Sequence, residues 1–224
     1  MKVIEQEIHS LKNSISEMWA LVHQQLYNAG EAMLTGDKEL AYKVISRERR
    51  VNAFELKIDS DCEDIIALYA PVAIDLRFVL AMYKINTNLE RLGDFAESIA
   101  RFAGNLPEGE PIDPQLVKET RVEEMLSELL SMISLTKEAF EKESSEIASR
   151  IFLKDNLIDE INHNSTAIIA KYIEEHKGSA SAGLYMAGVI RKMERFGDHC
   201  TNIEEELIFY LDAKVMKHMG KTEQ

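Results

Sequence analysis

Apolar side chains recur every three or four positions along most of this 224-residue chain. The pattern begins with Ile4, Ile8, Leu11, Ile15, Met18, Val22, Leu26, Ala29 and Met33. This spacing places an apolar stripe on one face of an α-helix. The sequence contains no Asn-Gly or Asp-Gly hairpin turn and no sustained alternation of apolar and polar residues, so nothing in it indicates a strand. We therefore expect an all-α fold.

Turn-forming residues divide the helical pattern into six segments. Gly36 and Asp37 interrupt the first helix, Pro71 stops the second, and residues 104–114 form the only stretch rich in both Gly and Pro. The first predicted helix ends at residue 35. The other five cover residues 38–69, 72–103, 114–142, 144–175 and 181–217. Because helices of about 30 residues are about 45 Å long, short turns should fold each set of three antiparallel. We expect two tandem three-helix bundles, residues 1–107 and 108–224.

Composition excludes several classes of protein. The formal net charge of −13 disfavours binding to nucleic acid, which depends on Lys and Arg. The longest apolar run, residues 65–74, contains Pro71 and is far shorter than the roughly 20 residues of a membrane span. The N-terminal residues lack the plan of a secretory signal, so we expect a cytoplasmic protein. The two cysteines have no metal-ligand spacing.

An internal duplication contains the main candidate functional residues. The segment from Leu89 to Asp94, LERLGD, recurs as MERFGD from Met193 to Asp198, and both copies lie on the third helix of their bundle. Residues four apart share one face of a helix, so Glu90 lies beside Asp94 and Glu194 beside Asp198. Like charges at this spacing destabilise a helix by about 0.2–0.5 kcal/mol. We expect a ligand that offsets this cost.

The second helix of each bundle carries one further carboxylate pair with the same spacing. These pairs are Glu55 with Asp59, and Asp155 with Asp159, which we pair as equivalents of one another. If neighbouring helices face each other at these levels, each bundle gathers four carboxylates around one point. Carboxylate oxygens are hard ligands that suit magnesium, calcium, manganese or iron. A single such pair is ordinary surface chemistry, but four in register favour a metal site over a solvated helical scaffold.

Other polar residues are weaker candidates. Those that could extend the metal sites are Asn52, Asn86, Glu97, Asn202, Glu205 and His163. The basic run of Arg47, Arg49 and Arg50 is typical of a solvated face.

The segments LERLGDFAESIA and MERFGDHCTNIEEE resemble the paired ERIGD-type segments of the PhoU family, and APVAIDLRF is similar to that family's entry into its third helix. The resemblance covers essentially the whole chain. It implies a non-catalytic, negative regulator of phosphate uptake whose partners are the ATPase subunit of the phosphate ABC transporter and a phosphate-sensing histidine kinase. It also implies bound iron, zinc, manganese, magnesium or calcium at the eight paired carboxylates. A homodimer is plausible because long apolar stripes are available.

Two alternatives remain beside this interpretation. A ferritin-like di-metal enzyme needs two Glu-x-x-His motifs, and the chain has only Glu160 with His163. A PhoU-like accessory protein of a low-affinity phosphate permease is the nearer alternative, although the paired full-length motifs favour the high-affinity transporter.

Overall fold

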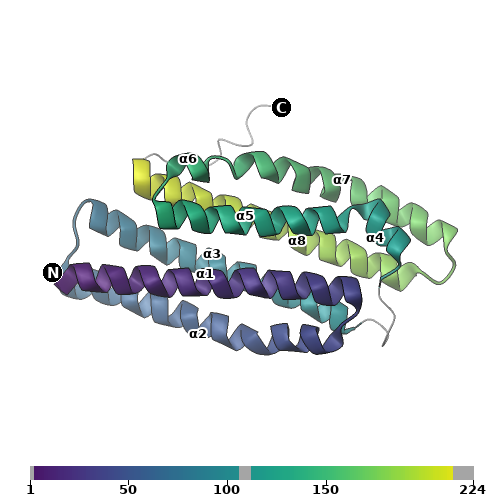
Figure 1. The fold of residues 1–224 in the computed structure, drawn as a ribbon, viewed down its shortest axis with the longest axis horizontal. Helices are drawn as coiled ribbons and strands as arrows, with labels where there is room; N and C mark the ends of the chain where they lie inside the picture. Colours follow the sequence, from purple (N-terminus) through teal and green to yellow (C-terminus); the bar gives the residue numbers. More distant parts are fainter. Residues whose placement is uncertain (1–2, 106–111, 214–224) are drawn as a thin grey trace.

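The computed structural model describes residues 3–105 and 112–213, and within these ranges it contains eight α-helices and no strand. The prediction of an all-α fold is confirmed. The first bundle consists of α1 (Val3–Thr35), α2 (Lys38–Tyr69) and α3 (Ile74–Gly104), which contact one another (Figure 1). None of the helices in the described ranges combines the length and the apolar run that a bilayer span requires.

The second half repeats the plan with two additional short helices. Its long helices α5, α7 and α8 contact one another, as α1, α2 and α3 do. The helices of this half are α4 (Pro114–Thr120), α5 (Val122–Lys142), α6 (Ser145–Ala148), α7 (Phe152–Glu175) and α8 (Ala180–Asp212). The predicted bundle boundary at residues 107 and 108, and the end of the helix predicted to reach residue 217, lie outside the described residues.

Two helices predicted to be continuous are broken. Arg121 adopts a left-handed conformation with φ of 56° and separates α4 from α5. Its guanidinium group pairs with Glu124 and Glu160, both at 2.7 Å, which stabilises the kink. The helix predicted over residues 144–175 is also interrupted, because α6 ends at Ala148 and α7 begins at Phe152. Neither break contains Gly or Pro, so the sequence carried no ordinary signal for them.

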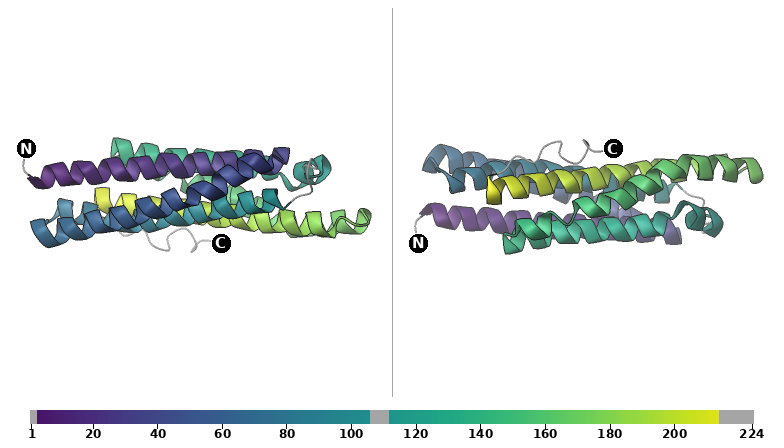
Figure 2. Two further views of the ribbon diagram at one scale, coloured as in Figure 1. Left: turned by 90° about the horizontal axis from the view of Figure 1, so that it is seen from below. Right: turned by 90° about the horizontal axis from the view of Figure 1, so that it is seen from above.

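The two bundles lie side by side. Helix α3 packs against α8, and α1 packs against α5, whereas α2 and α7 lie on the two outer sides (Figure 1). All the long helices run roughly along one axis, so the molecule is elongated (Figure 2). The candidate carboxylates are therefore carried by an outer helix and a central helix in each bundle.

Candidate functional site

Gly93 and Gly197 fix the register of the outer helices against α3 and α8. A Cβ atom added at Gly93 would lie 2.9 Å from Val51 Cγ1 and 3.5 Å from Glu48 Oε2. A Cβ atom added at Gly197 would lie 3.2 Å from Asp155 Oδ1 and 3.4 Å from Ile158 Cγ2. Each glycine thus lets a carboxylate and a β-branched residue three positions later approach its helix closely.

This register corrects the pairing drawn from the sequence. The residue equivalent to Asp155 is Glu48 and not Glu55, because Glu48 faces Gly93 as Asp155 faces Gly197. Glu48 and Glu55 are seven positions apart, which is two turns along the same helix face. A carboxylate spacing alone cannot distinguish these registers. Four residues later on each outer helix, Asn52 is the residue equivalent to Asp159.

Glu48 is a site residue that the sequence analysis missed. Its side chain is buried, and neither carboxylate oxygen has a hydrogen-bond partner. Burial raises the pKa of Glu48 to about 7, and the nearby charges of Asp94, Glu97 and Glu90 contribute to the rise. A buried carboxylate without a donor is costly unless it is protonated or bound to a cation.

The other acids of the first bundle form the partly exposed part of the same carboxylate face. Burial, followed by the charge of Asp94, raises the pKa of Glu90, and burial with the charge of Asp59 raises that of Glu55. Arg91 partly compensates, because its guanidinium group lies 3.2 Å from Asp94 and 3.6 Å from Glu90.

Asn86 is buried between α3 and α2, where it anchors the acids of α2. Its Nδ2 donates to Asp59 Oδ1 at 2.8 Å and to the Glu55 backbone oxygen at 2.9 Å. Its Oδ1 has no hydrogen-bond partner. The structure thus brings Asp59 beside Asn86, two helical turns from the level of Gly93.

The second bundle forms a corresponding carboxylate face between α7 and α8. Burial raises the pKa of Glu194, and the charges of Asp198 and Asp159 add to the effect. Asp155 lies against Gly197, which is one residue before Asp198. Asp155 and Asp159 of α7 therefore lie against α8, at the levels of Gly197 and Glu194.

Glu204 is a second buried carboxylate that the sequence analysis missed. Burial, together with the charges of Glu205 and Asp155, raises its pKa to about 9. The Phe152 backbone amide lowers this pKa slightly but lies outside ordinary hydrogen-bond geometry. Glu204 lies ten positions after Glu194 on α8, within the segment MERFGDHCTNIEEE but outside its pair of carboxylates four residues apart.

Replacing Glu204 with Gln should flatten the pH dependence of stability. The folded protein holds the Glu204 proton to about pH 9, whereas an unfolded chain releases it near 4.5, so folding loses stability as pH rises through this window. Between about pH 5 and pH 8 the wild type should lose on the order of 1–3 kcal/mol more than Glu204→Gln. Urea denaturation at several pH values measures this difference. The exposed Glu123→Gln variant should keep the wild-type slope, and an unchanged slope in Glu204→Gln would show that Glu204 is already ionised.

The weaker candidates are placed less favourably. Glu97 pairs with Arg101 at 2.6 Å. Asn202 and Glu205 line a groove with Tyr83, Lys84 and other residues of α3, so they face the first bundle. Asn52 and His163 are exposed on the outer helices. Glu160, the partner of His163 in the ferritin-like alternative, is exposed and pairs with Arg121 at 2.7 Å.

In each bundle the carboxylates lie on the facing sides of two helices, but they do not converge on one point as the sequence analysis expected. Among the residues that the structure describes, no three side chains of His, Cys, Asp or Glu are close enough to hold a metal ion. The chemistry of the donors nevertheless suits a hard cation, since each face contains a buried carboxylate without a hydrogen bond and neighbours whose pKa is raised. An ion would have to draw these side chains together.

The comparisons with known proteins cover almost the whole chain. A sequence profile described as the PhoU domain matches twice, at residues 15–103 and 122–207. The phosphate-specific transport system accessory protein PhoU homolog 1 of Thermotoga maritima is 32% identical over 95% of this chain and 90% of its own length. The accessory protein PhoU of Escherichia coli strain K12 is 31% identical over 97% of this chain and 88% of its own length.

Solved structures agree with the sequence matches. The crystal structure of the phosphate transport system regulatory protein PhoU from Streptococcus pneumoniae has a TM-score of 0.84 and 28% identity, and covers 95% of this chain and 98% of that chain. The PhoU structure from Pseudomonas aeruginosa also has a TM-score of 0.84, with 27% identity, and covers 94% of this chain and 99% of that chain.

Proposed function

Because this chain belongs to the PhoU family, we propose that it is a non-catalytic accessory regulator of phosphate transport. It restrains phosphate uptake and the phosphate-starvation response when phosphate is plentiful. The observation that carries this proposal is the duplicated family match, which spans both bundles and both carboxylate faces. Relatives named as accessory proteins of the phosphate-specific transport system favour this role over service to a low-affinity permease.

The proposal includes metal ions on the two carboxylate faces. In the first bundle Glu48, Glu90 and Asp94 would hold them, with Glu55 and Asp59 on the same face. In the second bundle the ligands would be Asp155, Asp159, Glu194 and Asp198. Iron, zinc, manganese, magnesium and calcium all accept carboxylate ligands. Bound cations would offset the burial and the mutual repulsion that raise the pKa of Glu90 and Glu194.

The proposed partners are the ATPase subunit of a phosphate ABC transporter and a phosphate-sensing histidine kinase, with a second copy of the chain as a further partner in a cytoplasmic homodimer. Support comes from apolar side chains around the turn between α2 and α3. Leu68, Val72 and Ile74 are 71%, 72% and 53% exposed. Clustered exposed apolar residues are typical of surfaces that bind other proteins.

A complementation experiment tests the regulatory role. The chain is expressed in a bacterial strain that lacks its own regulator of phosphate uptake and carries a reporter for phosphate-starvation genes. We expect the reporter to be repressed in phosphate-rich medium and active in phosphate-poor medium. The strain's own regulator serves as the positive control. A constitutively active reporter, with the chain expressed at the same level as that control, would contradict the proposal.

A further inference from the structure

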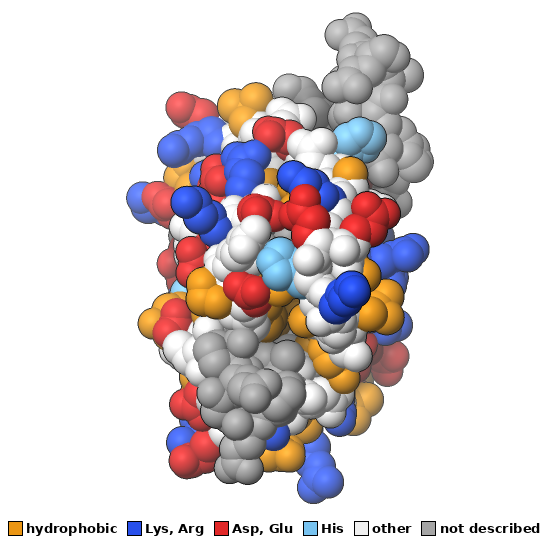
Figure 3. Space-filling model, turned by 90° about the vertical axis from the view of Figure 1, so that its right-hand side faces the viewer, with side chains coloured by type: hydrophobic (Ala, Val, Ile, Leu, Met, Phe, Trp, Pro, Cys, Tyr) orange, Lys and Arg blue, Asp and Glu red, His pale blue; other side chains and the backbone are white. Residues whose placement is uncertain are grey.

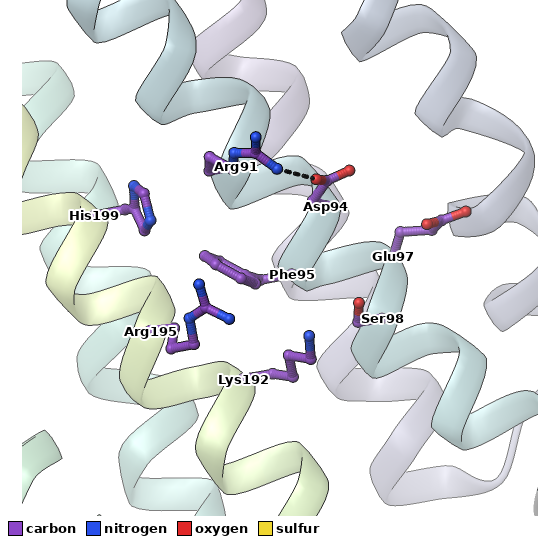
Figure 4. Close-up of a pocket in the computed structure, with 8 residues that line it drawn as sticks. All are labelled: Arg91, Asp94, Phe95, Glu97, Ser98, Lys192, Arg195 and His199. Carbon is purple, nitrogen blue, oxygen red and sulfur yellow. Dashed lines mark hydrogen bonds and ion pairs between the residues drawn. The ribbon is translucent and has the colours of Figure 1, made fainter.

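A hollow of about 700 Å³ lies between α3 and α8, where the two bundles meet (Figure 4). Its walls come from both helices, with Arg91, Phe95 and Ser98 on α3 and Lys192, Arg195 and His199 on α8. Asp94 and Glu97 also line it. Neither the proposed regulatory role nor the carboxylate faces account for the basic side chains of α8 in this hollow.

The two acids of the hollow are each paired with a basic residue on α3. Asp94 pairs with Arg91 at 3.2 Å, and Glu97 pairs with Arg101 at 2.6 Å. Lys192 and Arg195 are arranged differently. In the described part of the chain, their close contacts are with the ring of Phe95, whose centroid lies 5.6 Å from Lys192 Nζ and 5.1 Å from Arg195 Cζ. Among the residues that the structure describes, neither of them forms an ion pair with a carboxylate, although the charge of Arg195 acts to lower the pKa of the neighbouring Glu194.

The ring holds both cations in place on one side of the hollow. Phe95 is buried, and cation–π attraction favours the two charged groups over its ring (Figure 4). Two positive charges beside one ring repel each other, and a counter-ion between them would remove that cost. Because both groups already lie on the same side of the hollow, an anion could contact them together without a rearrangement of either helix.

We propose that this hollow binds a small oxyanion of the phosphate class. Arg195 and Lys192 supply charge-assisted hydrogen bonds, and the Ser98 hydroxyl on the facing helix supplies a neutral donor. The attraction for an anion comes from these local side chains alone, because the chain as a whole carries a net charge of −13 and repels anions at long range. Acidic and basic side chains are interspersed on the end of the molecule shown in Figure 3, without a single basic surface that would attract anions broadly.

The oxyanion is expected as a free ion and not as part of a nucleotide. Phosphate chemistry is shared by both, but a nucleotide base is commonly bound by stacking on an exposed aromatic ring. The Phe95 ring is buried to 4% exposure and already contacts two cations, and the His199 ring packs against it with centroids 5.4 Å apart. Phe95 therefore offers no platform for a base.

Isothermal titration of chelator-treated protein with inorganic phosphate tests the site, with sulfate and ATP as further ligands. The double variant Lys192→Gln with Arg195→Gln should bind phosphate at least about tenfold more weakly than the wild type, because it loses two charged donors. The control, Arg49→Gln with Lys171→Gln, changes the net charge equally at exposed positions and should bind like the wild type. Circular dichroism verifies that both variants fold.

Three outcomes would overturn the proposal. Phosphate binding could be absent at millimolar concentration, or equally weakened in the control, which would indicate a nonspecific effect of charge. Binding of ATP without binding of phosphate would exclude a site for a free ion. The titration uses metal-free protein and no cell, so its failure is distinguishable from failure of the regulatory role, which the reporter experiment measures.

Discussion

Millimolar Mg²⁺ or Mn²⁺, added to chelator-treated protein near neutral pH, should raise the thermal midpoint. A ligand that binds only the folded state stabilises it by about 3–4 kcal/mol at 100 to 1,000 times its dissociation constant. The carboxylate faces are destabilised without a cation, because burial and mutual repulsion raise the pKa of Glu48, Glu90 and Glu194. Differential scanning calorimetry with and without the ion measures the gain.

Glu48→Gln should raise the metal-free stability but reduce the stability gained when metal binds. Without metal it should stabilise the protein at about pH 8, on the order of 1–3 kcal/mol, because it removes a buried charge. The sign follows from the pKa: about 7 in the folded protein and 4.5 as the usual value, so the wild type loses stability as pH rises through this window. With metal, the same variant should show a smaller gain than the wild type, because a ligand is missing.

The exposed residue Glu63 on α2 provides the matched control. Glu63→Gln should respond to metal as the wild type does and should leave metal-free stability within about 0.5 kcal/mol. A wild-type chain that ignores all five candidate metals would refute the metal sites. An equal metal response in Glu48→Gln and the wild type would remove Glu48 from the ligands while leaving the other acids as candidates.

The sequence was sufficient to place helix ends that have a local chemical cause. The second predicted helix, residues 38–69, matches α2, because the Asp37 side chain accepts a hydrogen bond from the Leu40 amide and Pro71 follows the helix. The break at Arg121 was not predictable, since no Gly or Pro marks it and one ion pair at Arg121 is with the distant Glu160. Long-range ion pairs have no spacing rule in the sequence.

For the candidate site, the third-helix carboxylates were predictable and the register of the second helix was not. Glu90, Asp94 and their repeats share a motif that contains a glycine in both copies, so their pairing needs no tertiary information. Glu48 stands between Arg47 and Arg49 in a run that we interpreted as solvated. The three arginines of that run are indeed exposed, but Glu48 points to the opposite side and is buried. Only packing against Gly93 reveals this.

The packing of one bundle on the other was also absent from the sequence prediction, and Trp19 is central to it. Trp19 on α1 is fully buried, and its Nε1 donates to Thr136 Oγ1 on α5 at 3.0 Å. Its ring stacks on Phe140 of α5 with centroids 5.3 Å apart. An apolar stripe identifies a buried face but does not specify which helix covers it.

Trp19→Ala should therefore destabilise the protein by about 3–5 kcal/mol, the range expected when a buried aromatic side chain is removed from a packed core. This is a large part of the 5–15 kcal/mol or so that stabilises a typical domain. Trp19→Phe should cost less, about 1–2 kcal/mol, because it keeps an aromatic ring against Phe140 and loses mainly the hydrogen bond to Thr136. Urea denaturation followed by circular dichroism measures both variants.

Tyr42→Ala is the control, since Tyr42 is 62% exposed on the outer helix α2 and its loss should change stability by no more than about 0.5 kcal/mol. Trp19 is the only tryptophan, so its fluorescence in the wild type reports on the contact between α1 and α5. If the two bundles unfold as one unit, the fluorescence and circular dichroism transitions should coincide. A cost below about 1 kcal/mol for Trp19→Ala would contradict the packing described above, because a fully buried indole cannot be removed so cheaply.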